Sequence, residues 1–315
     1  MPTAVSLFSG CGGSDAGLAT AGFDVLMAND VLSYARDVYK ANLPETDFRL
    51  GDVTDIKHFP AADLLVGCYP CQGFSQAGVR DPSRKINFLY REFVRALQLI
   101  KPKAFIVENV SGMVRDDNLH LFRNQITRFR LSGYRVNAGI LDAREFGVPQ
   151  ERRRLFFVGV RSDFGVKYSF PDATHRYAEG DDDALPLCPT IGETIGDMEA
   201  WPTGEFDAQP FHWYYLSRNR YRGWGERSRT IVASSRHAPL HPVSPALKRI
   251  HTDKWEFVSD APARRISYRE AARLQGFGDL VFPETAGLAS KYRVVGNAVP
   301  PPVFAAVAGA LPNIW

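Results

Sequence analysis

Cysteine is scarce in this chain, with four residues among 315. Cys11, Cys68, Cys71 and Cys188 are too few for the disulfide scaffold of a small secreted protein. Cys68 and Cys71 have the Cys-x-x-Cys spacing of a redox pair or of half a zinc site. No second such pair and no nearby histidine would complete four metal ligands, so we expect no metal site.

Long apolar runs are also missing. No stretch approaches the ~18 residues that a membrane span needs, so we expect no membrane partner. The N-terminus enters a strand-like run without a basic leader, which predicts no signal peptide and a cytoplasmic location. Apolar content of 45% and charged content of 23% are ordinary for a globular protein, and the length suits two domains.

A strong excess of charge is absent as well, because the formal net charge is only +3. Its distribution is uneven, since Glu226 is the single acid between Ser217 and His237. The same segment holds six arginines, Arg218, Arg220, Arg222, Arg227, Arg229 and Arg236. Tyr221 and Trp224 lie among them. This pattern fits either a solvated basic loop or a nucleic-acid contact surface.

Strand-like and helix-like patterns alternate through the first half of the chain. The expected strands are 5–8, 25–28, 63–66, 104–107, 134–140 and 154–160. The expected helices between them are 15–21, 32–41, 88–100 and 119–131. Alternation of this kind predicts an α/β fold with a doubly wound, mostly parallel sheet.

The texture changes near residue 165, where prolines, aromatics and arginines become frequent and helical periodicity weakens. Ser267 and Glu270 later form a capping box, and an Ala-rich final helix is expected over 303–311. We expect a first domain at 1–165 and a smaller loop- and strand-rich domain at 166–262. A hinge at 263–285 and a tail at 286–315, which returns to the first domain, complete the chain.

Pro70-Cys71-Gln72 follows the apolar strand that ends at Val66. A thiol on a loop at the carboxyl end of a strand can meet a ligand in an open α/β sheet, and it is a nucleophile if its pKa is lowered. Most lone cysteines are buried and inert, so Cys71 needs support from other motifs.

A glycine-rich turn, Phe8–Gly13, follows the first strand, where glycines let the backbone approach a ligand. A dinucleotide fingerprint would want a third glycine where Asp15 stands, which argues against NAD. Asp30 and Asp52 follow the next two strand-like segments. Each is either a turn aspartate or a ligand-binding residue, Asp30 being suited to a ribose diol.

Glu108 ends the apolar strand 104–107, near the strand-end thiol, as an acid/base partner would. The stretch Gln150–Arg154 precedes another apolar strand. Alternation along that strand points Arg152 and Arg154 to one face and Arg153 to the other. The alternative is a basic strand entrance on the surface.

These motifs together resemble the DNA (cytosine-5)-methyltransferases over nearly the whole chain. Six of them occur in order, at Phe8–Gly12, Pro70–Gln72, Glu108–Val110, Gln150–Arg154, Arg269–Phe277 and Gly296–Pro300. Each motif alone is weak, whereas six in order are specific. The resemblance implies a Rossmann-like methyltransferase domain and identifies 166–262 as a target-recognition domain.

The resemblance also implies a mechanism. Cys71 adds to carbon 6 of a flipped-out cytosine, and carbon 5 becomes nucleophilic and accepts the methyl group of S-adenosylmethionine. Glu108 holds or protonates the ring nitrogen, Arg154 holds the base carbonyl, and Arg152 lies nearby for a phosphate or the ring. The loop 72–85 closes over the base.

The same resemblance implies the cofactor contacts. Phe8 stacks on the adenine, Gly10 and Gly12 approach the methionine part, and Asp30 takes the ribose. The remaining expected cofactor contacts are Asp52, Val53, Asn297 and Val299. Asp30 stands where Glu is usual and Cys68-Tyr69 where Gly-Pro or Gly-Phe is usual, which we expect to tune activity rather than abolish it.

The arginine-rich segment resembles the recognition region of members that methylate GGCC. Arginine is the side chain best suited to read guanine in the major groove. We therefore expect Arg218, Arg220 and Arg236 to read guanines and the other arginines to contact phosphates. Thr230 belongs to a Thr-hydrophobic pair common in such regions, and Gln72, beside the nucleophile, is also expected at the DNA.

Other functions remain open at this point. An RNA (tRNA) cytosine-5 methyltransferase would share the motifs but usually carries Cys-Phe-Thr, which is absent here. A catalytically silent DNA-binding module would lack the nucleophile or the cofactor glycines. An NAD-dependent oxidoreductase is disfavoured by Asp15, and an amino-methylating enzyme by the absence of an Asn/Asp-Pro-Pro-Tyr/Phe motif.

The expected partner is double-stranded DNA, bound by a monomer. A cognate restriction endonuclease would share the site without forming a stable complex. Because the first motif begins near residue 5, we expect no N-terminal regulatory domain and a bacterial or phage-type enzyme.

Overall fold

The computed structural model describes residues 1–70, 88–177 and 184–315. They form two compact units, each described here by itself. Unit 1 comprises Met1–Asp142, Arg153–Asp172 and Pro301–Trp315. Unit 2 comprises Ala143–Arg152 and Ala173–Pro300, apart from the undescribed residues.

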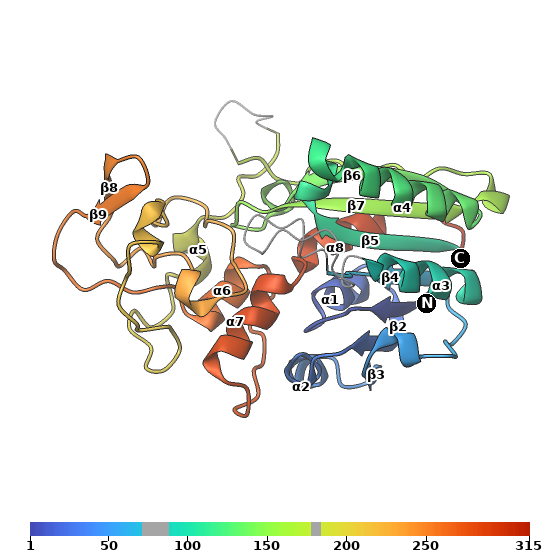
Figure 1. Ribbon diagram of the computed structural model, residues 1–315, viewed down its shortest axis with the longest axis horizontal. Coiled ribbons are helices and arrows are strands. Elements are labelled where there is room, and N and C mark those ends of the chain that lie inside the picture. The colour runs from blue at the N-terminus through green and yellow to red at the C-terminus, as the bar shows by residue number, and fades with distance from the viewer. Residues whose placement is uncertain (71–87, 178–183) are drawn as a thin grey trace. The chain divides into compact units, whose positions relative to one another are not determined.

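Unit 1 is built on a seven-stranded sheet with the spatial order β3-β2-β1-β4-β5-β7-β6 (Figure 1). The strands are β1 (Thr3–Leu7), β2 (Asp24–Asp30), β3 (Asp47–Leu50), β4 (Leu64–Gly67), β5 (Ala104–Val110), β6 (Tyr134–Asp142) and β7 (Arg153–Arg161). The first five run parallel, and β7 runs antiparallel to both β5 and β6. The predicted mostly parallel sheet is confirmed, and its winding reverses between β1 and β4, where ligands bind in such sheets.

Helices cover both faces of this sheet because neighbouring strand residues point to opposite sides. They are α1 (Gly13–Thr20), α2 (Ser33–Asn42), α3 (Tyr90–Ile100), α4 (Leu119–Leu131) and α8 (Pro301–Gly309). On β7, the Phe157 ring contacts Phe129 of α4 and the Phe156 ring contacts Phe304 of α8. All five helices predicted for unit 1 are confirmed to within two residues.

The crossing of α1 and α8 is close because α1 carries a glycine at the contact. A Cβ on Gly17 would lie 2.7 Å from the Pro301 carbonyl oxygen. The final helix therefore packs on α1 as well as on the sheet.

Unit 2 contains short elements separated by long loops. They are α5 (Ile191–Ile195), β8 (Leu247–His251), β9 (Lys254–Phe257), α6 (Tyr268–Leu274) and α7 (Leu288–Asn297). The predicted capping box is confirmed, since the Ser267 hydroxyl accepts the Glu270 N–H and the Glu270 carboxylate accepts the Ser267 N–H. Helix α7 is not predicted from the sequence, and it packs through Tyr292 and Val295, which are both buried and lie one turn apart on the same face.

Membrane and metal features were sought in the same described ranges. No helix there is both long enough and apolar enough to cross a bilayer. Nor do the described residues bring three His, Cys, Asp or Glu side chains together in a way that could hold a metal ion.

Candidate active site and DNA-reading surface

The loop that carries the predicted nucleophile leaves β4 at Gly67 and is described as far as Pro70. Cys71 and Gln72 lie outside the described residues. Burial raises the pKa of the Cys68 thiol well above its usual range, which disfavours the thiolate, the reactive form of a cysteine.

Tyr69 anchors the chain just before the loop. Its hydroxyl donates to Gln125 Oε1 at 2.6 Å, and its carbonyl accepts a hydrogen bond from the Asn109 side chain at 3.3 Å. Its ring meets those of Phe8 and Phe93 edge-on or tilted, each with centroids 6.0 Å apart. The departure from the common motif at this position therefore gives the loop entrance a fixed, buried attachment.

Glu108 and Arg154 form an ion pair on the adjacent strands β5 and β7. Arg154 Nε lies 2.9 Å from Glu108 Oε1, and both side chains are at least four-fifths buried. Antiparallel pairing places Val110 opposite Arg154 and Glu108 opposite Phe156, which brings the two charges together. Each buried charge therefore has a counter-charge, and Glu108 lies on β5, the strand next to β4.

The glycine-rich turn after β1 has an unusual backbone. Phe8 has φ of +58°, a left-handed conformation that is costly for a residue with a Cβ. Gly10 has φ of +56°, and a Cβ built on it would meet nothing within 4 Å. The Gly10 N–H donates to Asp30 Oδ2 at 2.9 Å, while Asp30 Oδ1 accepts the Leu32 N–H. The open space over Gly10 and the carboxylate beside it fit a nucleoside-containing cofactor.

Gly12 is constrained differently, because protein surrounds it. Its φ is +89°, and a Cβ there would lie 3.0 Å from both Tyr39 and Leu43 side-chain atoms. The two glycines of the motif therefore have different structural roles. Gly10 leaves room above the turn, whereas Gly12 lets α2 pack beneath it.

Asp15, treated above only as a missing glycine, is a fully buried carboxylate under this turn. It accepts hydrogen bonds from the hydroxyls of Ser6, Ser14 and Tyr39 at 2.6, 2.9 and 2.8 Å. Burial raises its pKa, and these donors oppose the rise. It joins β1, α1 and α2 beneath the turn, a role that no local sequence signal indicates.

The other predicted cofactor residues occupy varied positions. Asp52 is exposed and caps a short 3₁₀ helix by accepting the Thr54 N–H at 2.9 Å, whereas Val53 is buried. In unit 2, Asn297 is exposed at the end of α7 and Val299 is buried. Their cofactor contacts stay predictions.

Three sequence motifs meet inside unit 2. Gln150 donates to Gln275 Oε1 at 2.6 Å and accepts the Ile231 N–H. The buried Arg152 donates to the carbonyls of Ile231, Gly296 and Ala298. Strand β7 begins one residue later, so the expected alternation of Arg152 with Arg154 does not reach it. These bonds favour a positioning role for Arg152, and its contact with substrate stays a prediction.

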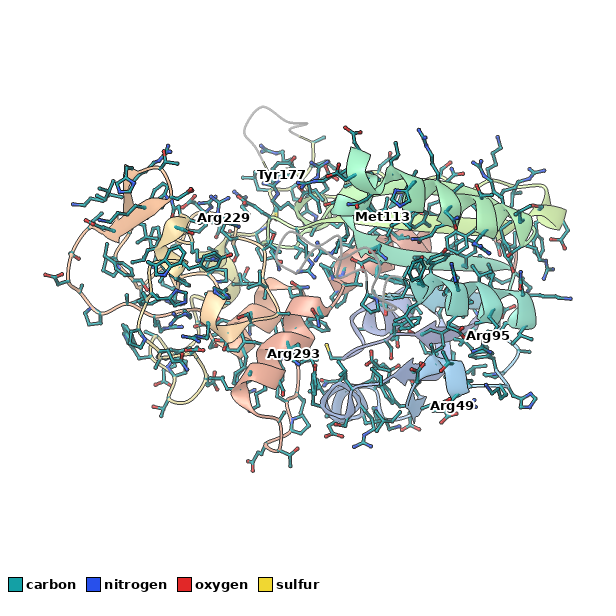
Figure 2. All side chains as sticks on the ribbon, viewed as in Figure 1. Arg49, Arg95, Met113, Tyr177, Arg229 and Arg293 are labelled. Atoms are coloured by element: carbon teal, nitrogen blue, oxygen red, sulfur yellow. The ribbon has the colours of Figure 1, made fainter. Side chains whose placement is uncertain are left out.

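The six arginines of the basic segment divide into two groups. Arg220, Arg222, Arg227 and Arg229 have protein partners for their guanidinium groups; Arg229 (labelled in Figure 2) donates to Glu151 Oε2 at 2.8 Å. Arg218 and Arg236 are exposed, and in the described residues neither guanidinium has a hydrogen bond or an ion pair. The Thr230 hydroxyl donates to the Glu151 carbonyl.

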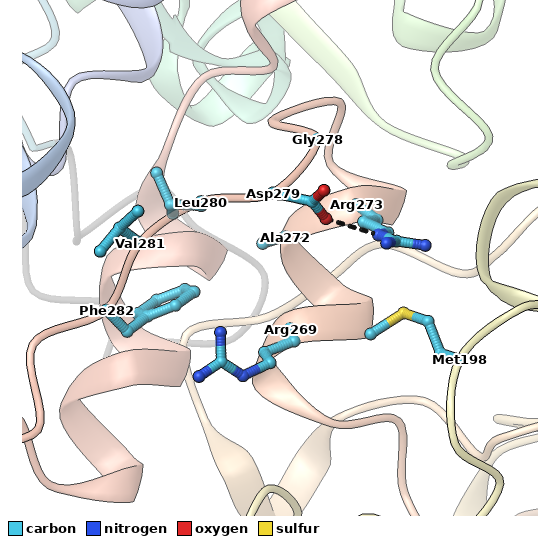
Figure 3. Close-up of a pocket in the computed structure, with 9 residues that line it drawn as sticks. All are labelled: Met198, Arg269, Ala272, Arg273, Gly278, Asp279, Leu280, Val281 and Phe282. Atoms are coloured by element: carbon cyan, nitrogen blue, oxygen red, sulfur yellow. Dashed lines mark hydrogen bonds and ion pairs between the residues drawn. The ribbon is translucent and has the colours of Figure 1, made fainter.

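A pocket of about 370 Å³ lies on α6 and the loop that follows it (Figure 3). Arg269 and Arg273 face it, and each is paired with carboxylates, Glu205 for the former and Asp197 and Asp279 for the latter. With its cations neutralised, the pocket offers no charge for an anionic ligand, and we assign it no part in the reaction.

Comparison with known proteins agrees with this geometry. The model of the C-5 cytosine-specific DNA methylase family matches residues 3–313. The chain is 35% identical to the type II methyltransferase M.BspRI of Lysinibacillus sphaericus, over 98% of this chain and 80% of that protein. It is 36% identical to M.BsuRI of Bacillus subtilis, over 98% and 79%.

Solved structures share the fold. A putative DNA modification methyltransferase from an Escherichia coli prophage superimposes with a TM-score of 0.70 at 21% identity, over 98% of both chains. The Dnmt2 methyltransferase of Schizosaccharomyces pombe gives 0.71 at 20% identity. The chain therefore belongs to the C-5 cytosine-specific DNA methylases, and its enzyme class is DNA (cytosine-5)-methyltransferase of the type II restriction-modification kind.

Proposed function

We propose that this enzyme methylates carbon 5 of cytosine in duplex DNA at the site GGCC, with S-adenosylmethionine as donor. The observation that carries the chemistry is the buried pair of Glu108 on β5 and Arg154 on β7. Strand β5 is adjacent to β4, the strand that leads into Pro70-Cys71-Gln72. A carboxylate and a guanidinium held together offer an acceptor and donors to the polar edge of one base.

The residues act in sequence on a cytosine that has left the duplex. The Cys71 thiolate forms a bond to carbon 6, and the displaced electron pair makes carbon 5 nucleophilic. Glu108, in its protonated form, gives its proton to the ring nitrogen as the adduct forms, and Arg154 holds the base carbonyl and orients Glu108. After carbon 5 has gained the methyl group, a solvent base takes its proton, the electron pair of that C–H bond restores the carbon 5–carbon 6 double bond, and Cys71 leaves as the thiolate.

The cofactor supplies an electrophilic methyl group when it is bound. Phe8, Gly10, Gly12 and Asp30 are proposed to hold it at the turn after β1. The open space over Gly10 and the Asp30 carboxylate support this assignment. Asp52, Val53, Asn297 and Val299 are proposed to complete the site.

Alanine at the two glycines should separate cofactor binding from folding. Gly10→Ala should lower the melting temperature by a few degrees through the strain of its positive φ alone, because its Cβ meets no protein atom, yet weaken S-adenosylmethionine binding about tenfold or more. Gly12→Ala should lower the melting temperature by several degrees more, because its Cβ crowds Tyr39 and Leu43. Calorimetry and equilibrium binding measure both effects, and equal binding by Gly10→Ala would contradict the assignment.

Target recognition is proposed for residues 166–262, with 263–285 as hinge and 286–315 returning to the catalytic part at 1–165. Arg218, Arg220 and Arg236 are proposed as guanine readers, with Thr230 and Gln72 at the DNA. The exposure of Arg218 and Arg236 favours them as guanine readers, whereas the Arg220 guanidinium already donates to the Tyr215 and His237 carbonyls. A monomer acts on each strand in turn, and a cognate endonuclease shares the site without a stable complex.

Replacing the exposed arginines with alanine should reduce the preference of the enzyme for GGCC over other sites. Arg218→Ala and Arg236→Ala should each cost about 1–3 kcal/mol on GGCC and little on a changed site, because a guanine contact exists only on the correct base. Arg222→Ala, at an arginine paired with Glu151, is the control and should weaken binding uniformly if it acts at all. Binding titrations on matched duplexes decide this, and uniform losses for all three variants would make Arg218 and Arg236 phosphate contacts.

The overall proposal is tested by tritiated methyl transfer to a GGCC duplex, a duplex with one changed base pair, and tRNA. Label on the GGCC duplex alone would support both the chemistry and the site. Equal label on both duplexes would overturn the site and keep the enzyme class. Label on tRNA alone would overturn the substrate.

A further inference from the structure

Two adjacent arginines of unit 2, Arg264 and Arg265, are both about 1% exposed but have different surroundings. Arg264 donates both terminal nitrogens to the Glu270 carboxylate at 2.9 and 2.7 Å. For Arg265, no carboxylate in the described parts of the chain lies within ion-pair distance. The Asp207 carboxylate acts on Arg265 only beyond ion-pair distance. A buried cation without a direct counter-ion is expensive, so a stability role explains Arg264 better than Arg265.

Arg265 instead donates to the backbone carbonyls of three residues in two segments of the chain. Its Nε donates to the Arg236 carbonyl at 3.0 Å. One terminal nitrogen donates to the carbonyls of Asp207 and Gln209, both at 2.8 Å. The other terminal nitrogen is buried and has no hydrogen-bond partner in the described residues.

The guanidinium of Arg265 also lies over two aromatic rings, 4.3 Å from the Phe211 centroid and 4.8 Å from the Tyr215 centroid. Tyr215 in turn donates its hydroxyl to the Ala238 carbonyl at 2.8 Å, and Arg220 lies 4.9 Å from the same ring. A planar cation that stacks and donates at once fixes more directions than an ammonium can.

These contacts converge on the two segments that carry the proposed guanine readers, residues 215–220 and 235–238, here called the reading segments. Arg265 holds the second through the Arg236 carbonyl and the first through the Tyr215 ring. Asp207 adds a link, because its carboxylate accepts the Ser235 hydroxyl at 2.7 Å. Arg264 reaches neither reading segment with its side chain and donates to Ala200, Arg265 and Glu270.

We propose that Arg265 is a positioning residue for sequence specificity, which fixes the spacing and orientation of the two reading segments without touching DNA. The proposal rests on the function proposed above, because it needs Arg218, Arg220 or Arg236 to read bases. Discrimination between sites requires each donor to sit within a few tenths of an ångström of its base edge, whereas phosphate contacts tolerate small shifts.

The test compares Arg265→Lys with Arg264→Lys. Lysine keeps the charge but loses the planar fork and its stacking in both variants. Arg265→Lys should reduce the ratio of affinities for GGCC and a single-change duplex about tenfold, the size of one base contact, while affinity for unrelated DNA and for S-adenosylmethionine stays within about twofold. Arg264→Lys should lower the melting temperature and leave the ratio unchanged.

A second, milder variant keeps the test decisive if Arg265→Lys does not fold. Tyr215→Phe removes only the hydroxyl bond to Ala238 and should shift the ratio in the same direction by a smaller factor. An unchanged ratio in both Arg265→Lys and Tyr215→Phe, or an equal loss in Arg264→Lys, would overturn the proposal. A wild-type enzyme that methylates DNA without sequence choice would overturn the proposed site instead, which is a separate outcome.

Discussion

Cys71→Ser is expected to reduce methyl transfer to duplex DNA by about a thousandfold or more, because a serine hydroxyl is far less ionised than a thiol and a poorer nucleophile. Tritiated methyl transfer under single-turnover conditions measures the loss. Binding of S-adenosylmethionine should remain, since the cofactor residues proposed around the turn after β1 are untouched. DNA binding should also persist, since the arginines proposed to read the DNA are unchanged.

Cys68→Ala is the matched control for this variant. Cys68 lies three residues earlier, and burial keeps its thiol protonated, so its removal should leave most of the activity. Comparable losses in the two variants would indicate a redox or structural pair of cysteines rather than a nucleophile. Substantial transfer by Cys71→Ser would refute the covalent mechanism outright.

Glu108→Gln is expected to lower kcat by about a hundredfold to ten-thousandfold, the usual contribution of a positioned acid or base. The amide keeps the shape of the side chain but not its charge. It also leaves the Arg154 guanidinium buried beside a neutral group, so a loss of stability of up to about 3–5 kcal/mol is expected. Stopped-flow methyl transfer and thermal unfolding separate the two effects.

Two further variants show whether the effects of Glu108→Gln come from lost chemistry or from lost stability. Glu151→Gln removes a carboxylate that pairs with Arg222 and Arg229 in unit 2 and is about one-third exposed, so it should cost little stability. In Glu108→Gln combined with Arg154→Met, the unpaired cation is gone and stability should recover while activity stays low. Recovery of activity together with stability would show that the pair serves the fold and not the chemistry.

Much of unit 1 was predictable from the sequence because its signals are local. Strands β1, β4 and β5 are short, mostly apolar runs, and helices α2 and α3 show clear apolar periodicity, with Lys101-Pro102 marking the end of α3. The antiparallel direction of β7 was not predictable, because alternation along a strand is the same in either direction. Its direction decides the site, since it places Arg154 against Glu108.

Unit 2 was predictable only where a local rule applies, as at the Ser267–Glu270 capping box. Helix α7 was missed; it begins after Gly287 without a side-chain cap, so no local signal marks its start. In the basic segment, too, the sequence does not show which residues pair. Six arginines look equivalent in the sequence, yet Glu151, more than sixty residues earlier, pairs with two of them, Arg222 and Arg229.

The sequence by itself determined the class of enzyme, the order of its motifs and the identity of the proposed nucleophile, because each rests on residue types at short spacing. Only the tertiary structure decided which charges are paired and which are left to meet a ligand. Asp15, Arg152 and Arg265 show why, since their partners are drawn from distant segments of the chain. Burial, which sets the energy of a charge or a hydrogen bond, is a property of packing and leaves no local pattern in the sequence.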